Sequence, residues 1–182
     1  MPKTTAGKAK QGAVIDGNRT SGSSLSQFRG IDHIAIAVLD LEASIEFFRD
    51  VLGFELKCRF HIKGRATGML SAELETRGIR FVLCQGTEPT SQVSELVRHH
   101  GVGVAHIALE VDDVDAAVEA LKSRGLGFDT SVIRGPGLTQ AFSSRSIETG
   151  LSFEIIHRGG ETGFLESNVQ QLFDQLEQSG KY

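Results

Sequence analysis

The 182-residue chain is long enough for one compact domain with a tail and too short for two domains of ordinary size. Its 40% hydrophobic and 23% charged residues are typical of a globular protein, and no apolar run approaches the roughly 18 residues that a membrane span needs. The net charge of −4 argues against a nucleic-acid binder, since such proteins usually carry a basic surplus. The two cysteines, Cys58 and Cys84, exclude a disulfide scaffold and a zinc finger, and this usage fits a reducing cytoplasm.

Residues 1–29 are predicted to form a disordered tail. This stretch is rich in Gly, Ser and Thr, and it has too few large apolar side chains to offset the entropy of ordering the chain. It lacks the apolar segment of a secretory signal, so no such signal is expected. A solvated tail is the simplest interpretation, and an arm that binds an anionic partner is the alternative.

The rest of the sequence contains an internal repeat. Residues 30–44 (GIDHIAIAVLDLEAS) align with residues 103–117 (GVAHIALEVDDVDAA). Each copy then closes on a similar apolar segment, GIRFVLCQ at 78–85 and GLSFEIIH at 150–157. A duplication of this kind indicates two copies of one supersecondary unit.

Each copy is predicted to fold as a strand, a helix and three further strands (βαβββ). In the first copy, about residues 30–86, the opening strand alternates in polarity, and the helix runs from Asp40 as its N-cap to Gly53. The second copy, about residues 103–158, repeats this order. The fold class is therefore α+β, with two tandem βαβββ modules whose sheets curve into an open barrel. The other predicted elements are strands near residues 54–60, 67–75 and 79–84, a linking helix near 90–101 and a C-terminal helix near 167–178.

The alternation assigns three polar residues to one concave face. The apolar residues of the opening strand are expected to lie under the helix, which leaves His33 on the other side. The repeat gives His106 the same position in the second copy. Glu154 lies between Phe153 and Ile155, which belong to the helix-covered face, so Glu154 is also expected to point into the concavity.

These three side chains form a candidate metal site. A buried carboxylate costs several kcal/mol unless it is paired or binds a metal. Two imidazoles and one carboxylate are the ligand set of non-haem Fe(II) oxygenases. The alternative is a structural pair of core histidines that the duplication preserved.

The segments IDHIAIAV, VAHIALEV and LSFEIIHR resemble the vicinal oxygen chelate superfamily, whose members include glyoxalase I, methylmalonyl-CoA epimerase, extradiol dioxygenases and bleomycin-resistance proteins. Within that superfamily, residues 99–114 and 138–164 are most similar to the catalytic half of 4-hydroxyphenylpyruvate dioxygenase and hydroxymandelate synthase. The resemblance implies a single vicinal oxygen chelate domain over residues 30–182 around one metal. The dioxygenase is normally about twice as long, with a second, non-catalytic pair of modules, and the resemblance covers its catalytic pair.

The resemblance also assigns roles to individual residues. It implies that the metal is Fe(II), although other divalent ions suit the same ligands. Gln140 matches the glutamine that contacts the 2-oxo acid, and Phe164 matches the phenylalanine that closes the site. The implied iron ligands are His33, His106 and Glu154.

The residue of the first copy that aligns with Glu154 is Val82. Glyoxalase- and epimerase-like members of the superfamily usually take a fourth protein ligand from the first module. A site with three protein ligands leaves positions for O2 and a chelating substrate, so Val82 favours oxygen chemistry. Glu73 and Glu75, on an earlier strand, could supply a ligand instead.

The sequence therefore predicts an Fe(II)-dependent dioxygenase that acts on a small 2-oxo acid or an aromatic chelating substrate. A metal-dependent lyase or isomerase of the glyoxalase or epimerase type is the first alternative, and a non-catalytic ligand-sequestering resistance protein is the second. The expected partners are a small-molecule substrate and O2, without nucleic acid or membrane, in a cytoplasmic protein. A homodimer is left open. The remaining polar candidates are expected at the surface, namely Gln85, His99, His100, His157 and Arg158.

Overall fold

A computed structural model describes residues 28–160, 170 and 173–175 of the protein. Most of the predicted tail, much of the predicted C-terminal helix and Phe164 lie outside these residues. The elements in chain order are β1 (Gly30–Ala37), α1 (Leu41–Glu46), η1 (Phe47–Val51), β2 (Glu55–Lys63), β3 (Gly68–Thr76), β4 (Ile79–Gly86), α2 (Gln92–His100), β5 (Gly103–Glu110), α3 (Val114–Lys122), β6 (Ile133–Gly135), β7 (Leu138–Phe142) and β8 (Phe153–Arg158).

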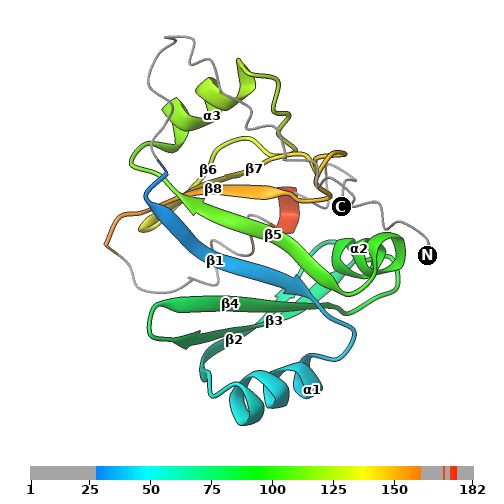
Figure 1. The fold of residues 1–182 in the computed structure, drawn as a ribbon. Coiled ribbons are helices and arrows are strands. Elements are labelled where there is room, and N and C mark those ends of the chain that lie inside the picture. Colours follow the sequence, from blue (N-terminus) through cyan, green and yellow to red (C-terminus); the bar gives the residue numbers. More distant parts are fainter. Residues whose placement is uncertain (1–27, 161–169, 171–172, 176–182) are drawn as a thin grey trace, which may run out of the picture.

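All the strands belong to one curved sheet of eight strands in the order β2-β3-β4-β1-β5-β8-β7-β6 (Figure 1). β1 pairs in parallel with β4, and β5 pairs in parallel with β8. The two halves join where β1 runs antiparallel to β5. The predicted fold of two βαβββ modules in an open barrel is confirmed, and the modules pair within the chain. The second module is the smaller one, because β6 has only three residues where β2 has nine.

The first helix begins where the sequence predicts. The Asp40 side chain accepts a hydrogen bond from the Ala43 backbone N–H at 3.0 Å, which caps the helix. The chain then widens into the π-helical turn η1 and leaves it at Gly53, whose φ of +76° suits glycine. Gln85, expected at the surface, instead accepts a hydrogen bond from the Leu41 N–H at 2.7 Å. That prediction was wrong because β4 extends to Gly86 and carries Gln85 under the helix start.

Helices α1 and α3 each pack against the sheet of their own module, on the side away from the pocket. In the first module, buried Leu41 and Ile45 of α1 pack with Val38. In the second module, Val114 and Val118 of α3 pack with other apolar residues under the helix. Figure 1 shows α1 and α3 at opposite ends of the sheet, and neither helix contributes a described residue to the pocket. Burial of the apolar face of each of these helices stabilises its module and leaves the concave face of the sheet free for a site.

The linking helix α2 is present and is capped by Ser91, whose hydroxyl accepts a hydrogen bond from the Ser94 N–H at 3.2 Å.

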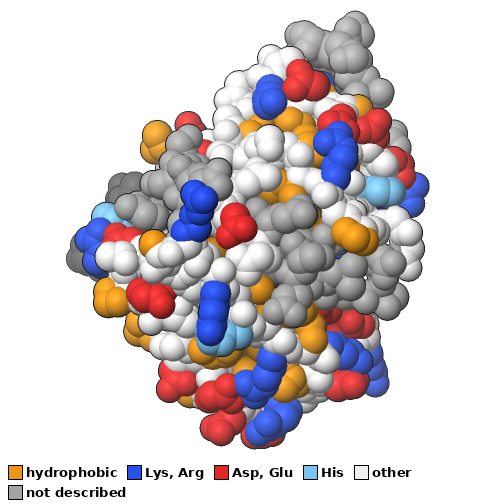
Figure 2. All heavy atoms as spheres, turned by 180° about the vertical axis from the view of Figure 1, so that it is seen from behind, with side chains coloured by type: hydrophobic (Ala, Val, Ile, Leu, Met, Phe, Trp, Pro, Cys, Tyr) orange, Lys and Arg blue, Asp and Glu red, His pale blue; other side chains and the backbone are white. Residues whose placement is uncertain are grey.

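Figure 2 shows the molecule from behind, with basic and acidic side chains interspersed over the visible face. Within the described residues, no helix combines the length and apolar character that crossing a membrane would require.

Candidate metal centre and its pocket

The strand register brings His33, His106 and Glu154 together. His33 on β1 pairs with Ala108 on β5, and Ala108 pairs in turn with Glu154 on β8. Side chains in one such row lie on the same face of a sheet, and the methyl group of Ala108 leaves the space between the other two open. His106 lies two residues before Ala108 on β5, so its ring projects from the same face.

The three side chains meet at their polar ends. The Nε2 atoms of His33 and His106 lie 3.3 Å apart. Oε2 of Glu154 lies 3.3 Å from the His33 nitrogen and 3.4 Å from the His106 nitrogen. His33 and Glu154 are almost fully buried, with 2% and 1% of their side-chain surface exposed, whereas His106 keeps 19%. The site is therefore closed on the His33 side and opens to the pocket on the His106 side.

Burial and mutual charge shift the pKa values of these groups. Burial alone would lower the pKa of His33, but the charges of Glu154 and Asp32 outweigh it and raise that pKa to about 9. Burial opposes ionisation of Glu154, yet the two histidines hold the pKa of Glu154 well below its usual value. Burial lowers the pKa of His106. Without a metal, the cluster therefore holds a proton on His33 at neutral pH.

The donor set fits a divalent metal ion. Three donor atoms about 3.3–3.4 Å apart can all bind one ion at a typical metal–ligand distance of about 2.1 Å. The second carboxylate oxygen of Glu154, Oε1, is buried and has no hydrogen-bond partner among the described residues. A bound ion would compensate the negative charge of this carboxylate, whose burial with an unpaired oxygen is otherwise unfavourable.

A buried charge network supports the metal site from behind. Asp32 accepts from the Nδ1 atom of His33 at 2.8 Å, and the guanidinium of Arg158 binds both Asp32 oxygens at 2.6 and 2.8 Å. Arg80 lies 3.4 Å from the same carboxylate. A carboxylate in this position fixes the tautomer and orientation of a metal-binding histidine. The second module offers no counterpart, since the residue before His106 is Ala105.

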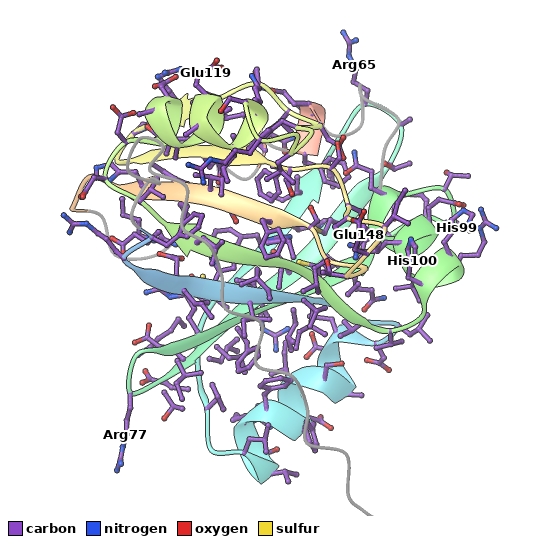
Figure 3. The ribbon with its side chains drawn as sticks, turned by 45° about the horizontal axis from the view of Figure 1, so that its top comes forward. Arg65, Arg77, His99, His100, Glu119 and Glu148 are labelled. Carbon is purple, nitrogen blue, oxygen red and sulfur yellow. The ribbon has the colours of Figure 1, made fainter. Side chains whose placement is uncertain are left out.

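Sequence reasoning missed this network. Arg158 was expected at the surface, but its side chain is only 11% exposed. His157, also expected there, is half-buried and bonds through Nδ1 to the Val111 carbonyl at 2.9 Å. The only signal in the sequence is the Asp-His pair at 32–33, because the arginine partner lies 126 residues away along the chain. His99 and His100 follow the prediction, since both are exposed and project outward at the end of α2 (Figure 3).

Val82 occupies the place in the first module that Glu154 has in the second. Ala35 pairs with Val82 just as Ala108 pairs with Glu154, and the Val82 side chain lines the pocket. Glu73, its partner on β3, is buried but lies 2.9 Å from Nε of Arg80. In the part of the chain that the structure describes, the metal-binding group is His33, His106 and Glu154, and neither Glu73 nor Glu75 belongs to it.

The pocket around the three donors has two different walls. The first module and α2 supply a mostly apolar wall, which buried Phe173 completes. The second module supplies polar groups, among them Gln140, Ser143 and Arg145. Gln140 is 2% exposed and lies on β7 on the same face as Phe142, the residue opposite Glu154. The structure therefore places Gln140 in the pocket beside the donors. The apolar wall consists of Phe60, Met69, Val82, Cys84, Val93, Leu96 and Phe173.

Comparison with known proteins identifies the class. Residues 30–147 match the Glyoxalase/Bleomycin resistance protein/Dioxygenase superfamily, and the chain belongs to this superfamily. 4-Hydroxyphenylpyruvate dioxygenase from Pseudomonas aeruginosa is 31% identical over 185 residues, covering 81% of this chain and 52% of the relative. The chain thus spans about half the length of that curated relative.

Two solved structures show the same fold with different chemistry. A mutant of 4-hydroxymandelate synthase from Streptomyces coelicolor superposes with a TM-score of 0.72 at 24% identity, covering 81% of this chain and 53% of that one. Methylmalonyl-CoA epimerase from Mycobacterium tuberculosis superposes with a TM-score of 0.63 at 26% identity, covering 76% of this chain and 93% of the epimerase. Most characterised members of the superfamily are enzymes, and the proteins similar to this chain include both dioxygenases and epimerases.

Proposed function

We propose that the protein is an Fe(II)-dependent dioxygenase that acts on a small 2-oxo acid or an aromatic chelating substrate, in the manner of 4-hydroxyphenylpyruvate dioxygenase. His33, His106 and Glu154 would hold the metal. The observation that carries this proposal is Val82, an apolar side chain where the second module has its carboxylate. A three-ligand face leaves cis positions for a bidentate substrate and O2.

The residues of this chain would bind the substrate and exclude water from it. The apolar wall that ends in Phe173 suits a ring or an alkyl chain. The amide of Gln140 can donate a hydrogen bond to a substrate carboxylate. Phe142 packs edge-on against His106, with ring centroids 5.1 Å apart, and so shields this ligand from water. Fe(II), when bound, would supply the electron transfer that lets O2 react with a 2-oxo acid. Phe164, if it acts as the resemblance implies, would close the open side.

The buried charge network would fix the metal ligands before substrate arrives. Asp32 holds His33 with Nδ1 as the donor, so that Nε2 is presented to the metal. Arg158 keeps Asp32 ionised and in place. The chain would therefore bind iron with one rigid histidine, on β1, and one more exposed histidine, on β5.

A second candidate function is a metal-dependent epimerase or isomerase. The supporting observation is Glu73, a buried carboxylate that lines the pocket on β3 and could act as a base. Two epimerases also match this chain over 93% and 87% of their own length. The ion pair of Glu73 with Arg80 argues against this role, because the arginine already engages this carboxylate at 2.9 Å.

One experiment separates the two functions. Protein is purified without chelator, its metal content is measured, and it is then given 4-hydroxyphenylpyruvate and other 2-oxo acids in an oxygen electrode. A dioxygenase consumes O2 in proportion to substrate and stops under anaerobic conditions. Turnover that continues undiminished without oxygen would exclude the dioxygenase and favour the epimerase.

A further inference from the structure

Arg145 is a partly buried cation that has no counter-ion among the described residues. It lies in the segment after β7 and lines the pocket near His106. Among the described residues it forms no ion pair, although every other arginine close to the site is matched by a carboxylate, as Arg80 and Arg158 are. A buried charge left without an opposite charge is costly, so its presence beside a ligand pocket calls for a reason.

Backbone carbonyl groups hold the guanidinium of Arg145 in place. One terminal nitrogen, Nη2, donates to the carbonyl oxygen of Ala105 at 2.6 Å, and Nη1 donates to that of Gly150. Nε is buried and has no partner among the described residues. A guanidinium has five N–H donors, so these bonds orient the group and leave donors for another acceptor. The carbonyl groups fix its position without neutralising its charge.

The surroundings of Arg145 agree with an uncompensated cation. Burial lowers the pKa of its guanidinium, and no neighbouring carboxylate offsets that effect. Asp129, which also lines the pocket, accepts a hydrogen bond from the Ser144 hydroxyl at 2.5 Å and forms no ion pair with Arg145. Arginines in the turns of the first module are different, since Arg65 and Arg77 point away from the molecule (Figure 3).

We propose that Arg145 binds an acidic group of the substrate, separate from the oxygen pair that chelates the metal. Arg145 donates a hydrogen bond to the carbonyl oxygen of Ala105, the residue directly before His106. The guanidinium therefore lies close to this proposed metal ligand. The natural substrate is then a chelating acid with a second carboxylate, sulfonate or phosphate, because a guanidinium binds such groups through two parallel hydrogen bonds. Its apolar body lies against the opposite wall of the pocket.

The inference rests on the proposed metal chelation, and a matched pair of probes separates the two. The full chain is loaded with Ni(II), so that no turnover occurs, and is titrated with 2-oxoglutarate and with 2-oxopentanoate by calorimetry. The two acids share the chelating 2-oxo carboxylate, and only 2-oxoglutarate carries a second one. Arg145→Gln removes the charge, Arg145→Lys retains it, and Arg134→Gln removes an exposed charge on β6 as a control. Melting temperatures check that each variant is folded.

We expect Arg145→Gln to weaken 2-oxoglutarate binding about ten-fold or more, as the loss of a charge-assisted hydrogen bond implies. Binding of 2-oxopentanoate should change less than about two-fold, Arg145→Lys should recover part of the loss, and Arg134→Gln should behave as the parent. Equal losses for both acids, or no loss for either, would overturn the role of Arg145 while leaving chelation standing. If 2-oxoglutarate binds through Arg145 and 2-oxopentanoate does not bind, the chelation proposal falls instead. If neither acid binds the parent protein, both proposals fall.

Discussion

The carboxylate of Asp32 lies 2.8 Å from Nδ1 of His33, so the two neighbouring residues act as one unit in which the acid orients the imidazole. Arg158, at the end of β8 and two strands away from β1 in the sheet, holds that carboxylate with two hydrogen bonds. His106 has no acid beside it, because the equivalent residue is Ala105. The duplication has thus given the site two histidines that look alike in the sequence and have different support in the structure.

The first prediction concerns this support. Replacing Asp32 with Asn keeps the shape but removes the charge that orients His33, so metal affinity should fall about 10- to 100-fold. The free energy of unfolding should also fall, by up to about 3–5 kcal/mol, because Arg158 loses its buried partner. Metal affinity is measured by competition with a chromogenic chelator, and stability by urea denaturation. Asp50→Asn, in an exposed pair with Arg49, is the matched control. An unchanged metal affinity in Asp32→Asn would show that the Asp32–His33 bond serves stability alone.

The second prediction concerns the three donors. His33→Ala, His106→Ala and Glu154→Gln should each abolish stoichiometric metal binding, since two remaining donors cannot hold the ion firmly. His106→Ala should disturb stability least, because that ring keeps 19% exposure while the other two are nearly fully buried. Metal content after gel filtration and the melting temperature give the two readouts. Any variant that retains full metal content removes its residue from the ligand set.

The sequence was sufficient to predict that three polar residues share one face of the sheet. Period-two alternation and the duplication together place His33, His106 and Glu154 on one face, and the strand register confirms that arrangement. Neither pattern could reveal Asp32, which strict alternation assigns to the opposite face from His33. The β1–β5 register shifts between Ile31 and His33, and an irregularity of this kind redirects a side chain. Arg158 was missed for another reason, since only the tertiary fold brings it beside Asp32.

The third prediction follows from the proton on the metal-free cluster. The pKa of His33 is raised to about 9, so His33 is mostly protonated at pH 7.5, while Glu154 is ionised and His106 is neutral. Metal binding at pH 7.5 should therefore release about one proton, and the release should fall towards zero above pH 9. Calorimetry in two buffers of different ionisation enthalpy measures this number. Release of two protons, or of none, at pH 7.5 would contradict the assignment.

The same shift sets the pH dependence of stability. The protonated His33 paired with Glu154 stabilises the metal-free protein fully below pH 6.5, the ordinary histidine value, and this contribution is lost as the pH rises through about 9. Saturating metal should remove that dependence, since the bound histidine is neutral at every pH in the range. The two denaturation series, with and without metal, check this. A metal-free protein whose stability is flat between pH 6.5 and 9 would show that His33 carries no such proton.

The last prediction uses Val82 to test the reaction class. Its side chain lines the pocket from the strand equivalent to that of Glu154, so a polar residue there can reach the open side of the metal. Val82→Gln is preferable to Val82→Glu, because Glu73 lies opposite on β3 and a second buried carboxylate would repel it. The new amide should compete with substrate for the open positions. Oxygen consumption should therefore drop at least about ten-fold while metal affinity holds or rises.

Val82→Leu, which adds bulk without a ligand atom, is the control and should leave metal affinity unchanged. If Val82→Gln consumes oxygen as fast as the parent, the position beside Val82 is not where substrate or O2 binds.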